Sequence, residues 1–225
     1  NAYYNPEFNS LTFPAGYLPI LVPPFFDLTY PRAVNSKYGG IGFVLGHEIG
    51  HGFDDQGIQL DEEGSLADCW NLRDWKWTDE DNKCFQDRVK CLIDQYSEAV
   101  KPDDKGWFNH CANKGATTLG ENIADLGGLR AALKAYKKKS SDEEREEQRL
   151  PGLENFTPDQ LFFETYAYSW CRKSRPENSL RPLLVDPHSP NELRVNGAVR
   201  NMPAFASAFN CKPGDKMFPE PEKRC

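Results

Sequence analysis

The stretch His47-Glu48-Ile49-Gly50-His51 decides both the fold and the chemistry that this chain of 225 residues can have. In a helix, side chains four residues apart project from one face, so both imidazoles can reach a single metal ion with Glu48 beside it. This is the layout of a zinc peptidase, although two histidines at this spacing also occur as ordinary core or surface residues. The rest of the sequence therefore has to supply what the motif lacks, above all a third ligand.

The motif lies in a segment that predicts a helix from Ser36, a residue type that caps helices, to about Asp54. Five glycines fall inside this segment, and each costs about 0.5 to 1 kcal/mol relative to alanine. Intrinsic propensity thus opposes the helix, so tertiary packing must hold it, and the small residues would let a neighbouring element or the metal come close. The apolar face comprises Ile41, Val44, Leu45 and Ile49, and the glycines are Gly39, Gly40, Gly42, Gly46 and Gly50.

A second stretch that could contribute to a metal site runs over residues 117–128. Thr117 or Thr118 can cap a helix here, in which Glu121 and Asp125 share one face. Acidic residues near a helix start are favoured by the helix dipole alone, so a solvated first turn is one interpretation. Because the HExxH motif is also present, we favour a second interpretation, in which Glu121 is the third zinc ligand and Asp125 orients a ligating imidazole.

Other third ligands can be tested on the sequence. The HExxHxxGxxH pattern needs glycine at position 54 and histidine at position 57, but the chain has Asp54 and Gly57. His110 lies in a predicted loop with no carboxylate or histidine at ligand spacing, and we interpret it as a surface residue. A downstream glutamate is the better candidate, giving a His, His, Glu site with the fourth position open to water, as in catalytic zinc sites.

The composition is that of an ordinary globular domain, with 39% hydrophobic and 27% charged residues. Lys and Arg total 27 against 34 for Asp and Glu, a net charge of -7, which argues against nucleic acid or an anionic membrane as the main partner. No run of about 18 apolar residues occurs, so no membrane span is predicted. With neither a signal peptide nor an initiator Met, we expect a processed or excised piece of a longer protein.

Outside the two chemical stretches, the sequence predicts a short β-hairpin over residues 1–14 and an extended apolar connector over Pro19–Phe26. An amphipathic helix is predicted over Asp81–Tyr96.

Seven cysteines without a CxxC pair indicate disulfides and an oxidising compartment. Because seven is odd, at least one cysteine is free or pairs outside the chain. Cys91 and Cys111 flank a predicted loop and could pair locally. Asn155 begins an N-x-T sequon, which fits a glycosylated, extracellular protein.

Six stretches resemble, in order, the neprilysin and endothelin-converting-enzyme family of zinc metalloendopeptidases (M13 type). The resemblance implies a mainly α (α+β) fold, a zincin-like catalytic lobe with a small N-terminal β-sheet. It makes residues 1–225 the C-terminal catalytic region, with the larger N-terminal part of the family ectodomain absent from this chain. The stretches are NAYY (1–4), PPFF (23–26), GHEIGHGFDDQG (46–57), GENIADLGGL (120–129), LFFETYAYSWC (161–171) and HSPNELRVNG (188–197).

The resemblance also assigns roles to single residues. It implies one zinc ion per chain on the motif histidines His47 and His51 and on Glu121, with Glu48 as general base and acid and Asp125 as the carboxylate behind a ligand. His188 matches the residue that stabilises the oxyanion, and Arg194 the residue that binds the substrate carbonyl beyond the scissile bond. Asn1 and Ala2 match the edge that pairs with the substrate backbone, while Phe25, Phe43, Val44 and Trp170 match the walls of the apolar leaving-group pocket.

The family pattern further suggests a disulfide between Cys84 and Cys225, and it predicts that Cys171 and Cys211 form disulfides with cysteines of the missing N-terminal region. Gly50 replaces a threonine common in the family motif, and the chain stops at Cys225, short of the usual last residues.

From these features we expect a secreted or membrane-anchored extracellular zinc endopeptidase. It would cleave short peptides before bulky hydrophobic residues, using a water that zinc polarises and Glu48 activates. The alternative is a non-catalytic fragment, a binding or antigenic module that keeps the zincin fold without turnover.

Overall fold

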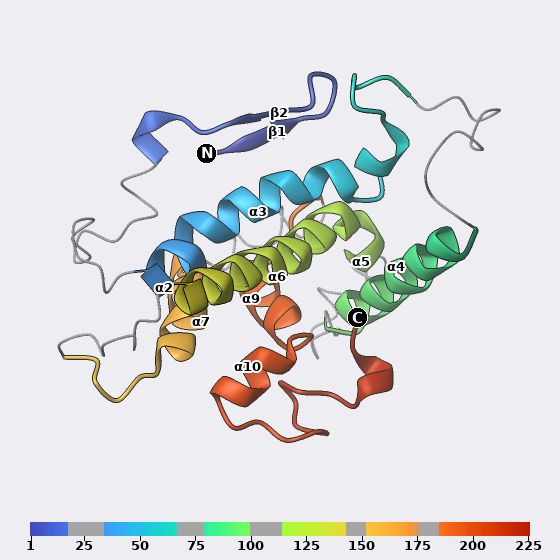
Figure 1. Ribbon diagram of the computed structural model, residues 1–225. Coiled ribbons are helices and arrows are strands. Elements are labelled where there is room, and N and C mark those ends of the chain that lie inside the picture. The colour runs from blue at the N-terminus through green and yellow to red at the C-terminus, as the bar shows by residue number, and fades with distance from the viewer. Residues whose placement is uncertain (18–33, 67–78, 100–113, 143–151, 174, 176–184) are drawn as a thin grey trace.

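The computed structural model describes residues 1–17, 34–66, 79–99, 114–142, 152–173, 175 and 185–225, and these form a mainly helical protein with one small sheet (Figure 1). The sheet is the predicted hairpin, in which β1 and β2 pair antiparallel with Tyr3 opposite Thr12. This architecture confirms the predicted fold class. Its strands are β1 (Tyr3–Asn5) and β2 (Ser10–Thr12), and its helices are α2 (Val34–Lys37), α3 (Phe43–Gly50), α4 (Asp79–Ala99), α5 (Lys114–Thr117), α6 (Leu119–Asp142), α7 (Pro158–Ser169), α9 (Asn191–Val199) and α10 (Pro203–Ala208).

The predicted motif helix is present but is not one continuous α-helix. A π-helical turn over Tyr38–Gly42 separates α2 from α3, and a 3-10 turn over His51–Phe53 follows α3. Gly39 lies within the π-helical turn, and a Cβ at that position would collide with the carbonyl oxygen of Phe162. The helix ends at Asp54, whose backbone is extended, close to the predicted boundary.

Glycines let α3 and α6 cross in close contact, as the two neighbouring helices in Figure 1 show. A Cβ on Gly46 would lie 2.6 Å from the carbonyl oxygen of Gly128, and one on Gly128 would collide with the backbone nitrogen of His47. A Cβ on Gly50 would lie 3.1 Å from the Cα of Ala124. The unfavourable helix propensity of these glycines is therefore offset by an interhelical approach that side chains would prevent.

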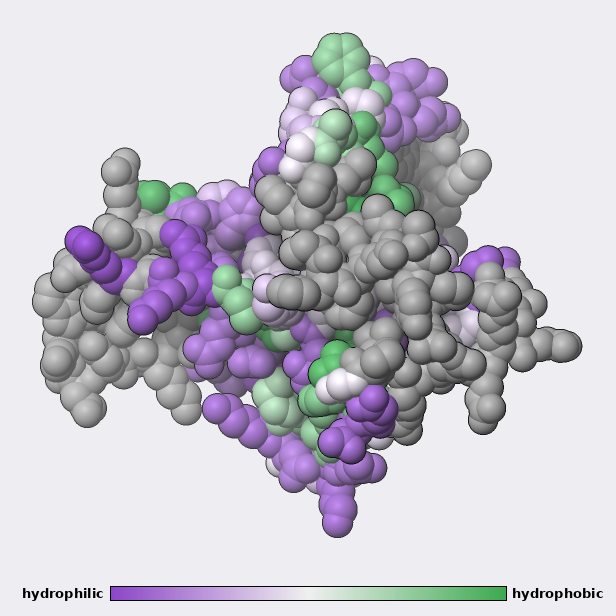
Figure 2. Space-filling view, turned by 90° about the vertical axis from the view of Figure 1, so that its left-hand side faces the viewer, coloured by the Kyte–Doolittle hydropathy of each residue, from purple (hydrophilic) through white to green (hydrophobic). Residues whose placement is uncertain are grey.

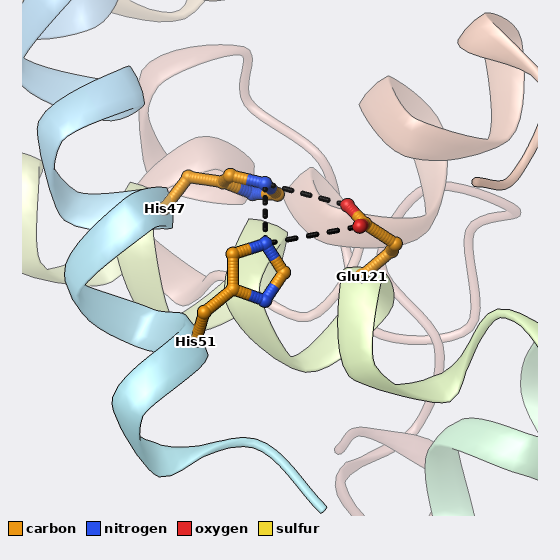
Figure 3. A group of neighbouring side chains, drawn as sticks. All are labelled: His47, His51 and Glu121. Carbon is orange, nitrogen blue, oxygen red and sulfur yellow. Dashed lines mark hydrogen bonds and ion pairs between the residues drawn. The ribbon is translucent and has the colours of Figure 1, made fainter. Parts of the chain in front are cut away.

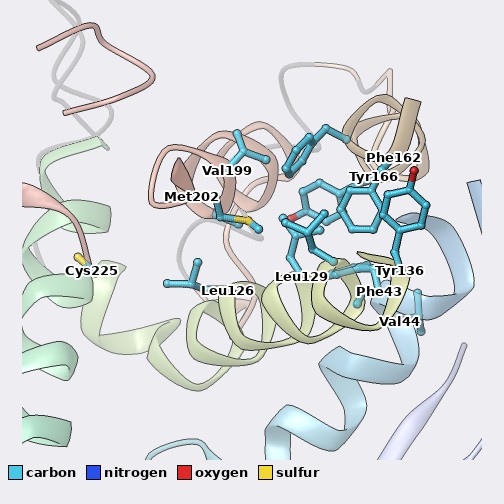
Figure 4. Packing of buried hydrophobic residues seen from close by; sticks show 14 of the residues in the cluster. Phe43, Val44, Leu126, Leu129, Tyr136, Phe162, Tyr166, Val199, Met202 and Cys225 are labelled. Carbon is cyan, nitrogen blue, oxygen red and sulfur yellow. The ribbon is translucent and has the colours of Figure 1, made fainter. Parts of the chain in front are cut away.

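Much of the hydrophobic core lies between α6 and the helices α7 and α9, where Leu129, Phe162, Tyr166 and Val199 meet in Figure 4. Leu129, Phe162 and Tyr166 are fully buried, and Phe162 stacks on Tyr136 with ring centroids 5.6 Å apart. Burying a side chain of this size contributes about 1.5 to 3 kcal/mol. Thr157 begins α7 with a capping box. Because α6 packs on α3 on one side and on this core on the other, the core fixes the position of both chemical stretches.

The disulfide expected between Cys84 and Cys225 is wrong. Cys225 is bonded to Cys91, with the two Cα atoms 5.6 Å apart, and Cys84 is exposed and unpaired. The two α4 cysteines are seven residues apart, which is two helical turns or about 10 Å along the axis, too far for either to replace the other. The C-terminal segment meets α4 at the turn that carries Cys91. There Arg88 donates to the carbonyl of Cys225, and Gln95 hydrogen-bonds to the same segment.

The same bond excludes local pairing of Cys91 with Cys111. Cys111, the connector Pro19–Phe26 with Phe25, and His110 lie outside the described residues. The predicted helix over residues 81–96 is confirmed as α4, which is a few residues longer at each end.

The surface mixes hydrophilic and hydrophobic residues, as the described part of the face in Figure 2 shows. Exposed apolar side chains include Leu45, Ile49 and Phe53, which follow one another on the outer side of the motif segment. Within the described ranges, none of the helices is both long and apolar enough to cross a membrane.

Candidate metal centre

Three side chains from two helices converge at one point, as Figure 3 shows. His47 comes from α3, His51 from the 3-10 turn that directly follows α3, and Glu121 from the first turn of α6. The Nε2 atoms of the two imidazoles lie 3.1 Å apart. Carboxylate oxygens of Glu121 lie 3.3 Å from Nε2 of His47 and 3.7 Å from Nε2 of His51. One ligand atom from each residue thus falls within 4.8 Å of the others, the one such group in the part of the chain that the structure describes.

The donor set fits a zinc ion. Two imidazole nitrogens and one carboxylate oxygen are the ligands of catalytic zinc sites that keep a fourth position for water or substrate. In both rings Nδ1 contacts a carboxylate outside the centre, so that Nε2 faces inward. This is the arrangement that fixes the tautomer of a ligating histidine.

The carboxylate behind His47 is Asp125, whose Oδ1 lies 2.9 Å from Nδ1 of the ring. Asp125 is completely buried, and Arg194 from α9 holds it through two contacts, Nε to Oδ2 at 2.7 Å and Nη2 to Oδ1 at 2.6 Å. Burial alone would raise the pKa of Asp125, but Arg194 and His47 bring it below its usual value. The guanidinium also lies 4.0 Å from the ring centre of Trp170, a cation–π contact that supports its orientation.

The charge on His47 follows from the same contacts. Burial disfavours the protonated ring, yet hydrogen bonding to Asp125 and Glu121 raises the pKa of His47 to about 9. In the absence of a metal the ring is therefore protonated at neutral pH, and a cation bound here would take the place of that proton.

The carboxylate behind His51 is Asp54, which the sequence reasoning missed. Its Oδ2 lies 2.8 Å from Nδ1 of His51, while Oδ1 accepts hydrogen bonds from the backbone N–H groups of Gln56 at 2.9 Å and Gly57 at 2.7 Å. Burial raises the pKa of Asp54, but these hydrogen bonds lower it below its usual value. A Cβ on Gly57 would collide with the carbonyl oxygen of His51, so this turn requires glycine. An aspartate three residues before a glycine, directly after the helix, is the signal that could have identified it.

His188 reaches the centre from the segment before α9. Its Nε2 lies 3.3 Å from Glu121, and its Nδ1 lies 2.7 Å from Oδ1 of Asp186, which also accepts the backbone N–H of His188. Burial raises the pKa of Asp186, but the hydrogen bonds from His188 lower it below its usual value. Asp186 is a second orienting carboxylate that the sequence reasoning missed, although it lies only two residues before the histidine.

A cavity of about 540 Å³ opens at the centre and brings together most of the predicted site residues. Glu48 is buried at its wall, between the two histidines in sequence. Arg194 lines the cavity as well, and its Nη2 lies 3.4 Å from Glu121. Besides the three converging side chains, the predicted residues that line the cavity are Asn1, Ala2, Phe43, Val44, Glu48, Trp170, His188 and Arg194.

Other predicted sites lie outside the cavity. Asn155 is exposed in the turn before α7, and its glycosylation stays a prediction. Cys171 is exposed and Cys211 is partly buried, and both are free cysteines in the described ranges.

Comparisons with known proteins agree with this geometry. The family model described as "Peptidase family M13" matches residues 1–225. Neprilysin-1 of Caenorhabditis elegans is 46% identical over 225 residues, which are 100% of this chain and 27% of that protein. Endothelin-converting enzyme 1 of Bos taurus is 42% identical over 226 residues, 97% of this chain and 26% of that protein.

Solved structures show the same similarity. The zinc metalloprotease Zmp1 of Mycobacterium tuberculosis, in complex with an inhibitor, superposes with a TM-score of 0.78 at 44% identity and covers 100% of this chain and 32% of its own. A Haemonchus galactose-containing glycoprotein complex gives 0.81 at 47% identity, covering 100% and 34%. The chain thus spans about a quarter to a third of the proteins that it matches.

Proposed function

The chain belongs to peptidase family M13, and from this premise we propose that it is the catalytic part of a zinc-dependent endopeptidase that hydrolyses short peptides. The observation that carries the proposal is the convergence of His47, His51 and Glu121 at a cavity whose wall also holds Glu48. Each imidazole already has a carboxylate at Nδ1, so the three inward ligand atoms are oriented for a cation.

We propose that these three side chains hold one zinc ion. When bound, zinc lowers the pKa of a water molecule and polarises the peptide carbonyl. Glu48 acts as the general base that removes the proton of the attacking water, and then as the acid that gives it to the leaving amine. Positioned acid–base groups of this kind contribute on the order of a hundredfold to ten-thousandfold in rate.

His188 and Arg194 direct this chemistry toward a peptide. Because Asp186 occupies Nδ1 of His188, Nε2 is the atom that can donate to the oxygen of the tetrahedral intermediate. Loss of one such donor typically costs on the order of a hundredfold to a thousandfold in rate. The contacts of Arg194 with Asp125 and Glu121 use Nε and Nη2, so Nη1 is the nitrogen that binds the substrate carbonyl.

The lining of the cavity supports cleavage on the amino side of bulky hydrophobic residues. Phe43, Val44 and Trp170 give it an apolar wall next to the metal ligands, to which we add Phe25 from the family resemblance. Asn1 and Ala2, which precede β1, lie at the same cavity and would pair with the substrate backbone.

The setting that fits this activity is extracellular, as a secreted protein or the ectodomain of a type II membrane protein. Similar proteins are three to four times longer than this chain, so we propose that a preceding N-terminal region completes the substrate chamber and pairs with Cys171 and Cys211. Endothelin-converting enzyme 1 and Neprilysin-1 are examples of such longer relatives.

A fluorogenic peptide with a bulky hydrophobic residue after the scissile bond tests the proposal. We expect cleavage that a chelator abolishes and added zinc restores. Glu48→Gln should keep stoichiometric zinc and lose about a hundredfold or more of the rate, whereas Glu121→Val should lose the metal itself. Absence of zinc-dependent cleavage by the folded, zinc-loaded complete protein would favour a non-catalytic binding module, and zinc retention by Glu121→Val would disprove the third ligand.

A further inference from the structure

A buried network of uncharged side chains joins α6 to the segment that precedes α9. Its members are Thr118, Asn122 and Ser189, which are 1%, 0% and 4% exposed. Neither the metal ligands nor the acid–base groups of the proposed mechanism include them. Ser189 and Asn122 are 67 residues apart in sequence, so the network is a tertiary contact and not a local turn.

The hydrogen bonds of the network run in one consistent order. The hydroxyl of Thr118 donates to the carbonyl of Lys114 at 2.8 Å, and its oxygen accepts Nδ2 of Asn122 at 2.9 Å. The hydroxyl of Ser189 lies 2.8 Å from Oδ1 of Asn122 and 3.0 Å from Oγ1 of Thr118. Because an amide oxygen only accepts, Ser189 donates to Asn122. The Asn122 amide is thereby fixed at both ends.

The sequence neighbours of this contact are site residues. Asn122 follows Glu121, and Ser189 follows His188, whose Nε2 lies 3.3 Å from the Glu121 carboxylate. The side chains of His188 and Asp186 are 42% and 40% exposed, so contacts of their backbone matter for their position, among them the hydrogen bond from Lys114 Nζ to the carbonyl of Asp186 at 2.6 Å. Ser189 is the buried residue of the segment, and its hydrogen bond ties the backbone of His188 to the turn of α6 that carries Glu121.

We propose that Asn122 and Ser189 are positioning residues that hold His188 at its working distance from Glu121 and from the bound substrate. The proposal rests on the proposed function, because His188 has to act on the substrate for its position to matter. Asp186 sets the rotation of the imidazole, and the Asn122–Ser189 hydrogen bond sets the place of the backbone from which it projects. Displacement of a reacting group by about 1 Å can cost on the order of a hundredfold in rate.

A double-mutant cycle between Ser189→Ala and His188→Ala tests the proposal in the complete, zinc-loaded protein. We expect Ser189→Ala to lower kcat about tenfold to a hundredfold with little change in KM, and to cause no further loss once His188 is alanine. Asn122→Ala should behave in the same way. Equal losses in both backgrounds would show a merely structural role and would overturn the proposal.

Asn201→Ala is the matched control. Asn201 is 2% exposed, and its amide donates to Gln95 at 2.7 Å and to the carbonyl of Gly197 at 2.8 Å, so its loss removes a similarly buried amide and its hydrogen bonds elsewhere. We expect it to lower stability and to leave kcat/KM unchanged in either background. A fall in kcat/KM like that of Asn122→Ala would mean that loss of any buried amide has this effect, against the proposal.

A second measurement does not depend on turnover. The chain has four histidines, so the imidazole 1H–13C signals can be assigned by single substitution and followed in the metal-free protein. The His188 signal should shift in Ser189→Ala and stay in place in Asn201→Ala, and an unmoved signal in Ser189→Ala would overturn the proposal. If the wild-type protein cleaves no peptide, the proposed function fails, while this measurement still decides whether Ser189 positions His188.

Discussion

The two imidazoles of the candidate metal centre are held by carboxylates of different kinds. Behind His47, the buried charge of Asp125 is balanced by the guanidinium of Arg194, which belongs to α9. Behind His51, the charge of Asp54 is met by two backbone N–H groups of its own turn. The first arrangement spans 69 residues between Asp125 and Arg194, and the second is complete within seven residues of sequence.

This difference shows which part of the centre depends on the whole fold. The His47 side requires α3, α6 and α9 to be packed together, because each helix contributes one member of the chain from imidazole to carboxylate to guanidinium. The His51 side requires only that the motif helix ends at Asp54 and turns at Gly57. Perturbing the first should therefore change both stability and metal binding, whereas perturbing the second should change metal binding alone.

The largest effect is expected from Arg194→Met, which breaks the His47 side. Removing the guanidinium leaves Asp125 buried beside the His47 ring but without its arginine partner, and loss of one partner of a buried ion pair costs about 3 to 5 kcal/mol. Urea denaturation of the metal-free protein measures the change in the free energy of unfolding.

Lys90→Met is the control for Arg194→Met. It breaks the Lys90–Asp94 pair, whose side chains are 77% and 57% exposed, and should change stability by less than about 1 kcal/mol. A similarly small change for Arg194→Met would show that Asp125 tolerates the loss of its partner, and the two sides of the centre would then not differ as described.

How far the sequence predicts the centre does not follow this division, because Asp125 on the His47 side was predicted and Asp54 on the His51 side was missed. The i, i+4 spacing of His47 with His51, and of Glu121 with Asp125, is readable because a helix converts that spacing into a shared face. Asp54 is local in sequence but escaped prediction, because its role depends on where the helix ends and on the backbone turn that Gly57 allows. The approach of His188 to Glu121 is tertiary, so only the family resemblance pointed to it.

Pairings between distant segments were the least predictable part. The disulfide partner of Cys225 depends on which turn of α4 the C-terminal segment meets, and Cys84 and Cys91 lie on nearly the same face of that helix. The glycine-rich motif segment was predicted as a helix, but its π-helical turn over Tyr38–Gly42, where Gly39 packs against the backbone of Phe162, was not foreseen.

A smaller effect is expected from Gly128→Ala, which acts on the packing beneath His47. The added methyl group would collide with the backbone nitrogen of His47, so α3 and α6 must separate. Overpacking of this kind costs about 1 to 3 kcal/mol. Zinc affinity should fall as well, because the separation moves His47 away from Asp125 and Glu121.

Gly127→Ala is the matched control, one residue earlier on α6. A Cβ on Gly127 meets nothing within 4 Å in the described structure, so alanine should stabilise the helix by about 0.5 to 1 kcal/mol and leave zinc binding unchanged. Thermal denaturation and a zinc titration of both variants provide the measurement. If the two substitutions have the same effect, the close crossing of α3 and α6 does not explain the glycines.

The smallest effect on stability is expected from Asp54→Asn, which changes only the His51 side. The asparagine oxygen can still accept the backbone N–H groups of Gln56 and Gly57, but its amide then faces Nδ1 of His51. The ring must accept at Nδ1 and carry its proton on Nε2, the wrong tautomer for a ligand. We expect zinc affinity to fall about tenfold to a hundredfold with little loss of stability.

A competition titration against a chromophoric chelator measures the zinc affinity of Asp54→Asn, and 15N NMR of the metal-free protein reports the tautomer of His51. Asp55→Asn is the control, since Oδ1 of Asp55 is buried without a hydrogen-bond partner in the described structure and burial raises the pKa of this carboxyl. That variant should retain full zinc affinity. If only Asp55→Asn lost zinc affinity, the orienting residue would be Asp55 and not Asp54. If Asp54→Asn and Asp55→Asn lost equal affinity, the total negative charge near His51, and not the single hydrogen bond to Nδ1, would hold the metal.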